Sequence, residues 1–362
     1  MKAQARTPAV AGRFYPASPE KLQRELKHLF SRAKSKECNN VRAVISPHAG
    51  YVFSGTVAAS AFNQIDEEHR YERIFLIGSS HQVALKGAAV YTQGDFLMPY
   101  GTVTTDVDFC KKLVLTHPGL FSEDSRAHRD EHSLEVQLPF LHHVLRHEYV
   151  IVPIIIGTSD PSVCEKIAKV LVPYFNTDNL FVISSDFSHY PGYEDALTVD
   201  AATRDAILQN APEALMQTLT ENSRLHVPGL ATSLCGWTSV LTLLYMTSGN
   251  SSFSYRAIDY KNSGDSALYG DKSQVVGYWA MAVTEQNNAS GDSIKPEEQE
   301  MLLDIARKSI ESVVVRGKHL SLEQASGYPP LLQQQRGAFV TLYKGKKLRG
   351  CIGRMTANLP LF

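Results

Sequence analysis

The sequence lacks a long apolar run, an excess of charge of one sign and an apolar leader at its N-terminus. Its most apolar stretch, at 150–156, is too short to span a bilayer and contains Pro153. With 36 basic and 37 acidic residues the formal net charge is -1. A balanced charge argues against a surface that binds nucleic acid. We therefore expect a soluble, cytoplasmic protein that binds neither nucleic acid nor a membrane.

The sequence also lacks any closely spaced pair of cysteines. Its five cysteines are scattered and odd in number, which fits reduced thiols in a cytosol better than a disulfide framework. They are Cys38, Cys110, Cys164, Cys235 and Cys351.

Three segments share one pattern, in which an apolar run of strand length ends at a polar tip that carries a histidine. The runs at 41–45, 74–77 and 180–183 precede His48, His81 and His189. Continuous apolar strands are typical of a parallel sheet covered by helices, and such sheets bind ligands beyond the carboxyl ends of their strands. Imidazole is both a common metal ligand and a base near neutral pH. The pattern predicts an α/β fold with a central, mostly parallel sheet and a metal or acid/base site at one edge.

The alternation of helices and strands stops near residue 284. Residues 285–294 are polar and rich in Asn and Ser, which indicates a linker. A helix from Pro296 and a hairpin over 337–353 are then expected. We predict a first domain at 1–284 and a small α+β unit at 295–362, which is short for a core of its own.

Several motifs in a fixed order carry a resemblance to known proteins. They are PHAGYVFSG, GSSHQ, MPYGTVTTD, DEHSLEVQLPF, VPIIIG, SSDFSHY, LCGW and VVGYWAMAV. Together they make residues 7–284 similar to the Memo family, which itself resembles the class III extradiol dioxygenases of the LigB type. The segment GAFVTLYKGKKLRGCIG, at 337–353, resembles the start of an Ammecr-type domain. That second resemblance implies an Ammecr-type unit of which only the N-terminal part is present.

The Memo resemblance implies a metal site formed by His48, His81 and Cys235. Without the resemblance, Cys235 reads as a small buried apolar residue, the common state of a free cysteine. In the dioxygenases that this family resembles, the implied metal ligands are two histidines and a glutamate around ferrous iron. A thiolate in place of the carboxylate softens the site, so we expect iron or copper, with zinc as an alternative.

The resemblance also implies an acid/base at His189, with Asp186 placed to orient it. The alternative is that Asp186 caps a turn and His189 hydrogen-bonds locally. Before His132, the acidic residues Asp130 and Glu131 fit a first helical turn, where they would only complement the helix dipole. The resemblance places His132 toward the pocket as a further candidate.

These expectations define two alternative functions. The first is a metal-dependent redox or dioxygenase-like enzyme of the AmmeMemoRadiSam system, whose third member is a radical S-adenosylmethionine protein. The second is a binding module that recognises an anionic group or a peptide without turnover. Cys351 is expected to be a buried strand cysteine rather than a thiol activated by Arg349.

Overall fold

The computed structural model describes residues 5–286, 294–320, 328–345 and 347–354. The chain divides into two compact units, Met1–Gln286 and Asn287–Phe362. Most of the linker predicted at 285–294 lies outside the described residues.

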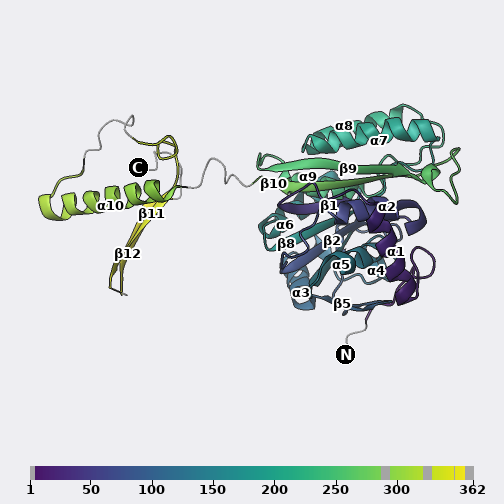
Figure 1. Cartoon of the computed structure of the whole chain (residues 1–362), viewed down its shortest axis with the longest axis horizontal. Helices are drawn as coiled ribbons and strands as arrows, with labels where there is room; N and C mark the ends of the chain where they lie inside the picture. Colours follow the sequence, from purple (N-terminus) through teal and green to yellow (C-terminus); the bar gives the residue numbers. More distant parts are fainter. Residues whose placement is uncertain (1–4, 287–293, 321–327, 346, 355–362) are drawn as a thin grey trace. The chain divides into compact units, whose positions relative to one another are not determined.

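A sheet forms the centre of the first unit (Figure 1). It has ten strands, and the strand order along its main path is β4-β5-β7-β2-β8-β1-β10-β9. From β5 to β1 the neighbouring strands are parallel, whereas β10 and β9 are added antiparallel at one side. This arrangement confirms the predicted α/β fold with a mostly parallel sheet. The strands on this path are β1 (Val41–Ser46), β2 (Arg73–Ser79), β4 (Phe96–Met98), β5 (Gly101–Thr105), β7 (Val150–Ile156), β8 (Asn179–Ser184), β9 (Phe253–Asn262) and β10 (Gly277–Glu285). The short strands β3 (Ala88–Val90) and β6 (Phe121–Ser122) pair beside β7.

Side chains along each central strand alternate between two apolar cores, one on each face of the sheet. Helices α1 (Pro19–Arg32), α2 (Tyr51–Phe62) and α5 (Leu138–Val144) cover one face. Helices α3 (Val107–Thr116), α6 (Pro161–Leu171) and α9 (Trp237–Thr247) cover the other. Because both faces are covered, the central strands are apolar throughout, as the sequence predicted.

The remaining helices of the first unit extend this framework. α7 (Tyr193–Leu208) and α8 (Pro212–Arg224) pack on each other, and α7 lies against β9 and β10 (Figure 1). The short α4 (Arg126–Arg129) and a 3-10 turn (Glu135–Gln137) precede α5. Pro139 lies in the first turn of α5, where its missing N–H costs no hydrogen bond. No helix within the described ranges has both the length and the apolar character to cross a membrane.

The second unit contains helix α10 (Pro296–Arg316) and a hairpin of β11 (Ala338–Lys344) with β12 (Lys347–Arg354). Both elements were predicted. The expectation that Cys351 is buried is wrong, because its side chain is exposed on the hairpin, where the Thr341 hydroxyl donates to its sulfur at 3.2 Å. Among the residues described, the hairpin strands pair only with each other, so no further strand covers Cys351.

Candidate metal centre

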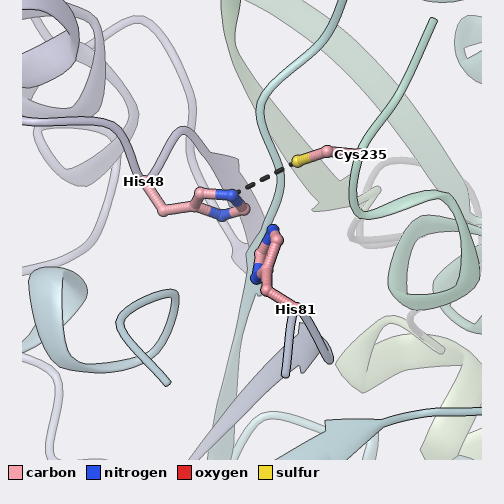
Figure 2. A group of neighbouring side chains, drawn as sticks. All are labelled: His48, His81 and Cys235. Atoms are coloured by element: carbon pink, nitrogen blue, oxygen red, sulfur yellow. Dashed lines mark hydrogen bonds between the residues drawn. The ribbon is translucent and has the colours of Figure 1, made fainter. Parts of the chain in front are cut away.

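Strands β1, β2 and β8 each end in a short tip at the carboxyl edge of the parallel sheet, and these tips carry His48, His81 and Asp186. The loop before α9 brings Cys235 to the same edge. One donor atom from each of His48, His81 and Cys235 lies within 4.8 Å of the other two (Figure 2). The structure therefore brings together the three residues for which the resemblance implies metal ligation.

Cys235 is held against the end of β8 by close backbone packing. A side chain on the next residue, Gly236, would lie 2.6 Å from the carbonyl oxygen of Ser184, so only glycine allows this approach. The backbone N–H of Cys235 donates to the carbonyl of Asp186 at 3.2 Å, and the N–H of Asp186 donates to the Cys235 sulfur at 3.2 Å. Burial, reinforced by the charge of Asp186, raises the pKa of the Cys235 thiol well above its usual range.

His48 is 2% exposed, and each of its ring nitrogens has a partner. Nδ1 lies 2.9 Å from the Ser184 hydroxyl, which itself donates to the carbonyl of Ser133. Because that hydroxyl has a single hydrogen, Nδ1 of His48 must donate to Ser184, which leaves the lone pair on Nε2. Nε2 lies 3.2 Å from the Cys235 sulfur (Figure 2). Burial, and then the neighbouring His132, lower the pKa of His48 well below its usual value.

His81 is more exposed, at 28% of its side chain, and a carboxylate holds it. Its Nδ1 donates to Glu131 at 2.9 Å, and its backbone N–H donates to the other oxygen of Glu131 at 2.8 Å. Burial lowers the pKa of His81, but the hydrogen bond and charge of Glu131 outweigh burial, so the pKa is raised overall. Nε2 of His81 is thereby left free to bind a ligand.

From the sequence, Glu131 was expected to lie in the first turn of a helix and to complement the helix dipole. That expectation is wrong. Its side chain is 1% exposed and bonds to His81 rather than lying on a helical surface. Burial raises its pKa, but the His81 hydrogen bond and charge outweigh burial and bring the pKa to about 2. The sequence signal was its place directly before His132 in DEHSLEVQLPF.

His132 lies beside the two tip histidines, with its ring centroid 4.9 Å from that of His81 and 5.3 Å from that of His48. Its Nδ1 is 3.5 Å from Glu131, and burial lowers its pKa. The ring of Phe14, from the N-terminal segment, makes a T-shaped contact with it, with centroids 5.0 Å apart. His132 therefore faces the site, as the resemblance implied.

Asp186 and His189 form a second group that includes Cys235, with one donor atom from each within 4.8 Å of the others. Asp186 is 3% exposed, and its Oδ1 accepts the backbone N–H of His48 at 2.7 Å. Its Oδ2 lies 3.9 Å from Nε2 of His189. Burial raises the pKa of Asp186 to about 7 and lowers that of His189 to about 4.

Two imidazoles and a thiolate form a donor set that zinc, copper and iron accept. In both imidazoles the second nitrogen is already hydrogen-bonded, which fixes the ring and the tautomer as in natural metal sites. The residues present therefore fit a metal ion at this edge of the sheet.

Comparison with known proteins identifies the family to which the chain belongs. The model of the Memo-like protein family matches residues 6–282. The chain belongs to the Memo family. A MEMO1 family protein of Aquifex aeolicus is 35% identical over 279 residues, covering 77% of this chain and 98% of the relative. A MEMO1 family protein of Methanopyrus kandleri is 32% identical over 287 residues, covering 76% and 98%.

Two further matches complete the comparison. The AMMECR1 family model matches residues 303–362, after the Memo-like region. Among solved structures, an uncharacterized protein from Escherichia coli K12 is similar with a TM-score of 0.41 and 13% identity, covering 65% of this chain and 98% of that one. This structural likeness is too low to add to the assignment.

Proposed function

We propose that the chain is a metal-dependent redox enzyme, related in chemistry to the extradiol dioxygenases, with His48, His81 and Cys235 as its metal ligands. The observation that carries the proposal is the approach of three donors from three separate segments to within 4.8 Å of one another. Such a cluster of partly buried polar groups is costly to assemble unless a ligand compensates for their desolvation. A bound iron or copper ion would supply one-electron redox chemistry at this position.

His189 is the residue that we propose to move a proton. Its Nε2 is buried and has no hydrogen-bond partner within the described part of the chain, so the nitrogen is available to a substrate. Its backbone N–H donates to the carbonyl of Thr232 at 3.0 Å, which fixes the residue. The Asp186 carboxylate lies 3.9 Å from Nε2 of His189, where its charge can act on the ring without a hydrogen bond, and His132 lies beside the neighbouring His48. An imidazole at this place suits general acid/base catalysis.

The wider setting is proposed from the two family matches. A Memo-like region and an AMMECR1 region in one chain support membership of the AmmeMemoRadiSam system, with a radical S-adenosylmethionine protein as partner. The substrate would be a small molecule or a peptide. Because all five cysteines are free thiols, the proposal favours a reducing compartment, the cytoplasm.

The proposal is tested by separating metal binding from turnover. In protein purified without oxygen, His189→Gln should keep its iron or copper while metal-linked redox turnover falls by about 10²- to 10⁴-fold, the usual contribution of an acid/base. Cys235→Ser should instead lose metal, because the thiolate is removed. Cys351→Ser, at an exposed thiol of the hairpin, is the matched control and should change neither quantity.

Two results would contradict this division of roles. One is full turnover in the His189 variant, and the other is loss of metal from that variant as complete as from the Cys235 variant. A pocket that binds its partner equally well with and without metal would favour the binding-module alternative.

A further inference from the structure

We propose that a cavity between α8 and the segment 230–237, here called the α8 cavity, binds a small uncharged molecule with an apolar body and one hydrogen-bond donor. Its volume is about 400 Å³, which is in the range of cavities that bind small molecules. Of the residues described, none that belongs to the metal centre lines this cavity. The α8 cavity is therefore a site separate from the metal centre.

Half-buried apolar side chains from both sides form the wall of the α8 cavity. Met216 and Leu219 come from α8, and Leu230 and Trp237 come from the segment that faces it. Apolar surface that leaves water against such a wall contributes favourably to binding. The wall therefore favours a ligand with an aliphatic or aromatic body.

The charge of the ligand follows from the side chains that the cavity lacks. Among the residues described, the lining contains no acidic or basic side chain. A charged ligand would lose part of its hydration in the cavity without meeting an opposite charge, which is unfavourable. The cavity therefore selects an uncharged molecule.

Two hydroxyl groups on α8 define the polar part of the ligand. The Thr220 hydroxyl donates to the carbonyl of Met216 at 2.8 Å, and the Ser223 hydroxyl donates to the carbonyl of Thr220 at 2.7 Å. Because each hydroxyl has a single hydrogen, its oxygen offers a ligand only lone pairs while these bonds are kept. A ligand that bonds to these oxygens must therefore donate, as the O–H of an alcohol does.

The segment on one side of the α8 cavity also holds the tip that carries His189. The backbone N–H of His189 donates to the carbonyl of Thr232 at 3.0 Å, and the N–H of Ala231 donates to the carbonyl of His189 at 3.0 Å. A molecule in the cavity contacts this segment directly. One consequence rests on the proposed function: occupation of the cavity should alter turnover, because it acts on the backbone that positions His189.

A series of straight-chain alcohols tests the site without an activity assay. The full chain would be titrated with butanol, hexanol and octanol while NMR follows the methyl groups of its methionines, with the Met216 signal assigned through Met216→Leu. The Met216 signal should shift and saturate. Each added methylene should tighten binding by roughly fourfold, so hexanol should bind roughly 15-fold more tightly than butanol. Hexanoate, which has a chain of the same length but is charged, should bind at least about tenfold more weakly than hexanol.

Variants of α8 locate the bound alcohol. Leu219→Ala removes part of the apolar wall and should weaken hexanol binding by about fivefold. Thr220→Val keeps the shape of the side chain but removes its acceptor oxygen, and should also weaken binding by about fivefold. Leu225→Ala is the matched control, because Leu225 is 65% exposed and lies outside the lining, and it should leave the affinity unchanged.

Specific results would overturn this inference. Equal affinities for hexanol and hexanoate, or no gain in affinity with chain length, would contradict the proposed class of ligand. A Met216 signal that does not saturate, or an equal loss of affinity in the Leu225 variant, would contradict the site. If Leu219→Ala folds poorly, Leu230→Ala removes the facing wall and should weaken binding to the same extent. None of these measurements depends on metal or turnover, so failure of the site and failure of the proposed function are distinguishable.

Discussion

His48 and His81 follow strands of the same kind, yet their surroundings differ. His48 is 2% exposed, and a neutral hydroxyl, that of Ser184, accepts from its ring. His81 is partly exposed, and a buried carboxylate, that of Glu131, accepts from its ring. The pKa of His48 is consequently lowered and that of His81 raised. The comparison shows that the pKa of a histidine at a strand tip depends on the groups around its ring. The apolar pattern of the strand does not determine it.

The two tips also depend on different parts of the chain. Ser184 belongs to β8, inside the sheet. Glu131 belongs to an irregular segment, and Arg6, from near the N-terminus, donates to the carbonyl of Glu131 at 2.6 Å. Arg6 also forms a fully buried ion pair with Glu135 at 2.7 Å. The His81 side of the site is thus supported by the N-terminal segment, whereas the His48 side is supported by the sheet.

Removing the Arg6 charge should produce the largest effect. Arg6→Met leaves the Glu135 carboxylate buried without its cation, and breaking such a pair typically costs about 3 to 5 kcal/mol. Urea unfolding followed by circular dichroism should show this loss, together with weaker metal binding at the His81 side.

An exposed ion pair provides the control for Arg6. Lys169→Met removes the partner of Glu165 on the surface of α6, where such pairs contribute about 0 to 1 kcal/mol. If the two variants lose equal stability, the N-terminal segment does not support the site as described.

Most of the fold could be predicted from the sequence because the central strands are buried on both faces and are therefore apolar throughout. The helix after Cys235 was placed at 235–246 and is found at Trp237–Thr247. α8 was missed, although Pro212 lies in its first turn and its apolar side chains share one face, because the helix is largely polar and few of its side chains are buried. The burial of Cys351 was wrong because strand alternation does not show whether a further layer covers the strand.

The site was only partly predictable for a related reason. His48, His81 and His189 stand out because each ends an apolar run. The residues that hydrogen-bond to these histidines do not stand out in the sequence. Glu131 and Ser184 come from segments that are remote in sequence from His81 and His48, to which they bond. Arg6 is likewise remote in sequence, 125 residues from Glu131. Such long-range pairs depend on tertiary packing, which the local pattern does not encode.

A buried histidine that is not a proposed metal ligand tests, without a metal, whether burial lowers the pKa of a histidine in this fold. His128 is 2% exposed, and burial lowers its pKa to about 4 from a usual value of 6.5. Between pH 6.5 and 4 the unfolded chain binds a proton that the native state does not, so stability falls as the pH falls. The difference amounts to at most about 3 kcal/mol.

His128→Gln should flatten this dependence, since glutamine can still donate to the carbonyl of Ala89 that His128 contacts at 3.1 Å. Denaturant unfolding at several pH values would measure the slope for the variant and the unaltered chain. If the slope of stability against pH is the same in both proteins, burial does not lower the pKa of His128 in the native state.

A smaller effect is expected from neutralising the carboxylate at His81. Glu131→Gln removes the charge that raises the pKa of His81. The glutamine side chain has one acceptor oxygen, so it cannot accept from both the ring and the backbone N–H of His81 as the two carboxylate oxygens do. Loss of such an outer partner typically lowers metal affinity by about 10- to 100-fold. Competition with a chelator would measure the change, and Glu123→Gln, at an exposed residue, is the control. An affinity equal to that of the unaltered chain would show that Glu131 does not orient His81.

The smallest effect is expected at the other tip. Ser184→Ala removes a neutral acceptor from Nδ1 of His48, and a neutral hydrogen bond contributes about 1 kcal/mol, or roughly a fivefold change in metal affinity. Ser60→Ala removes a hydroxyl that is equally buried but bonds to Asp259 at 2.7 Å, so it controls for the loss of a buried hydroxyl. Because the packed end of β8 still surrounds the His48 ring, its orientation should survive the change. A loss at Ser184 as large as that at Glu131 would mean that the two tips depend equally on their partners, despite the difference in charge and burial.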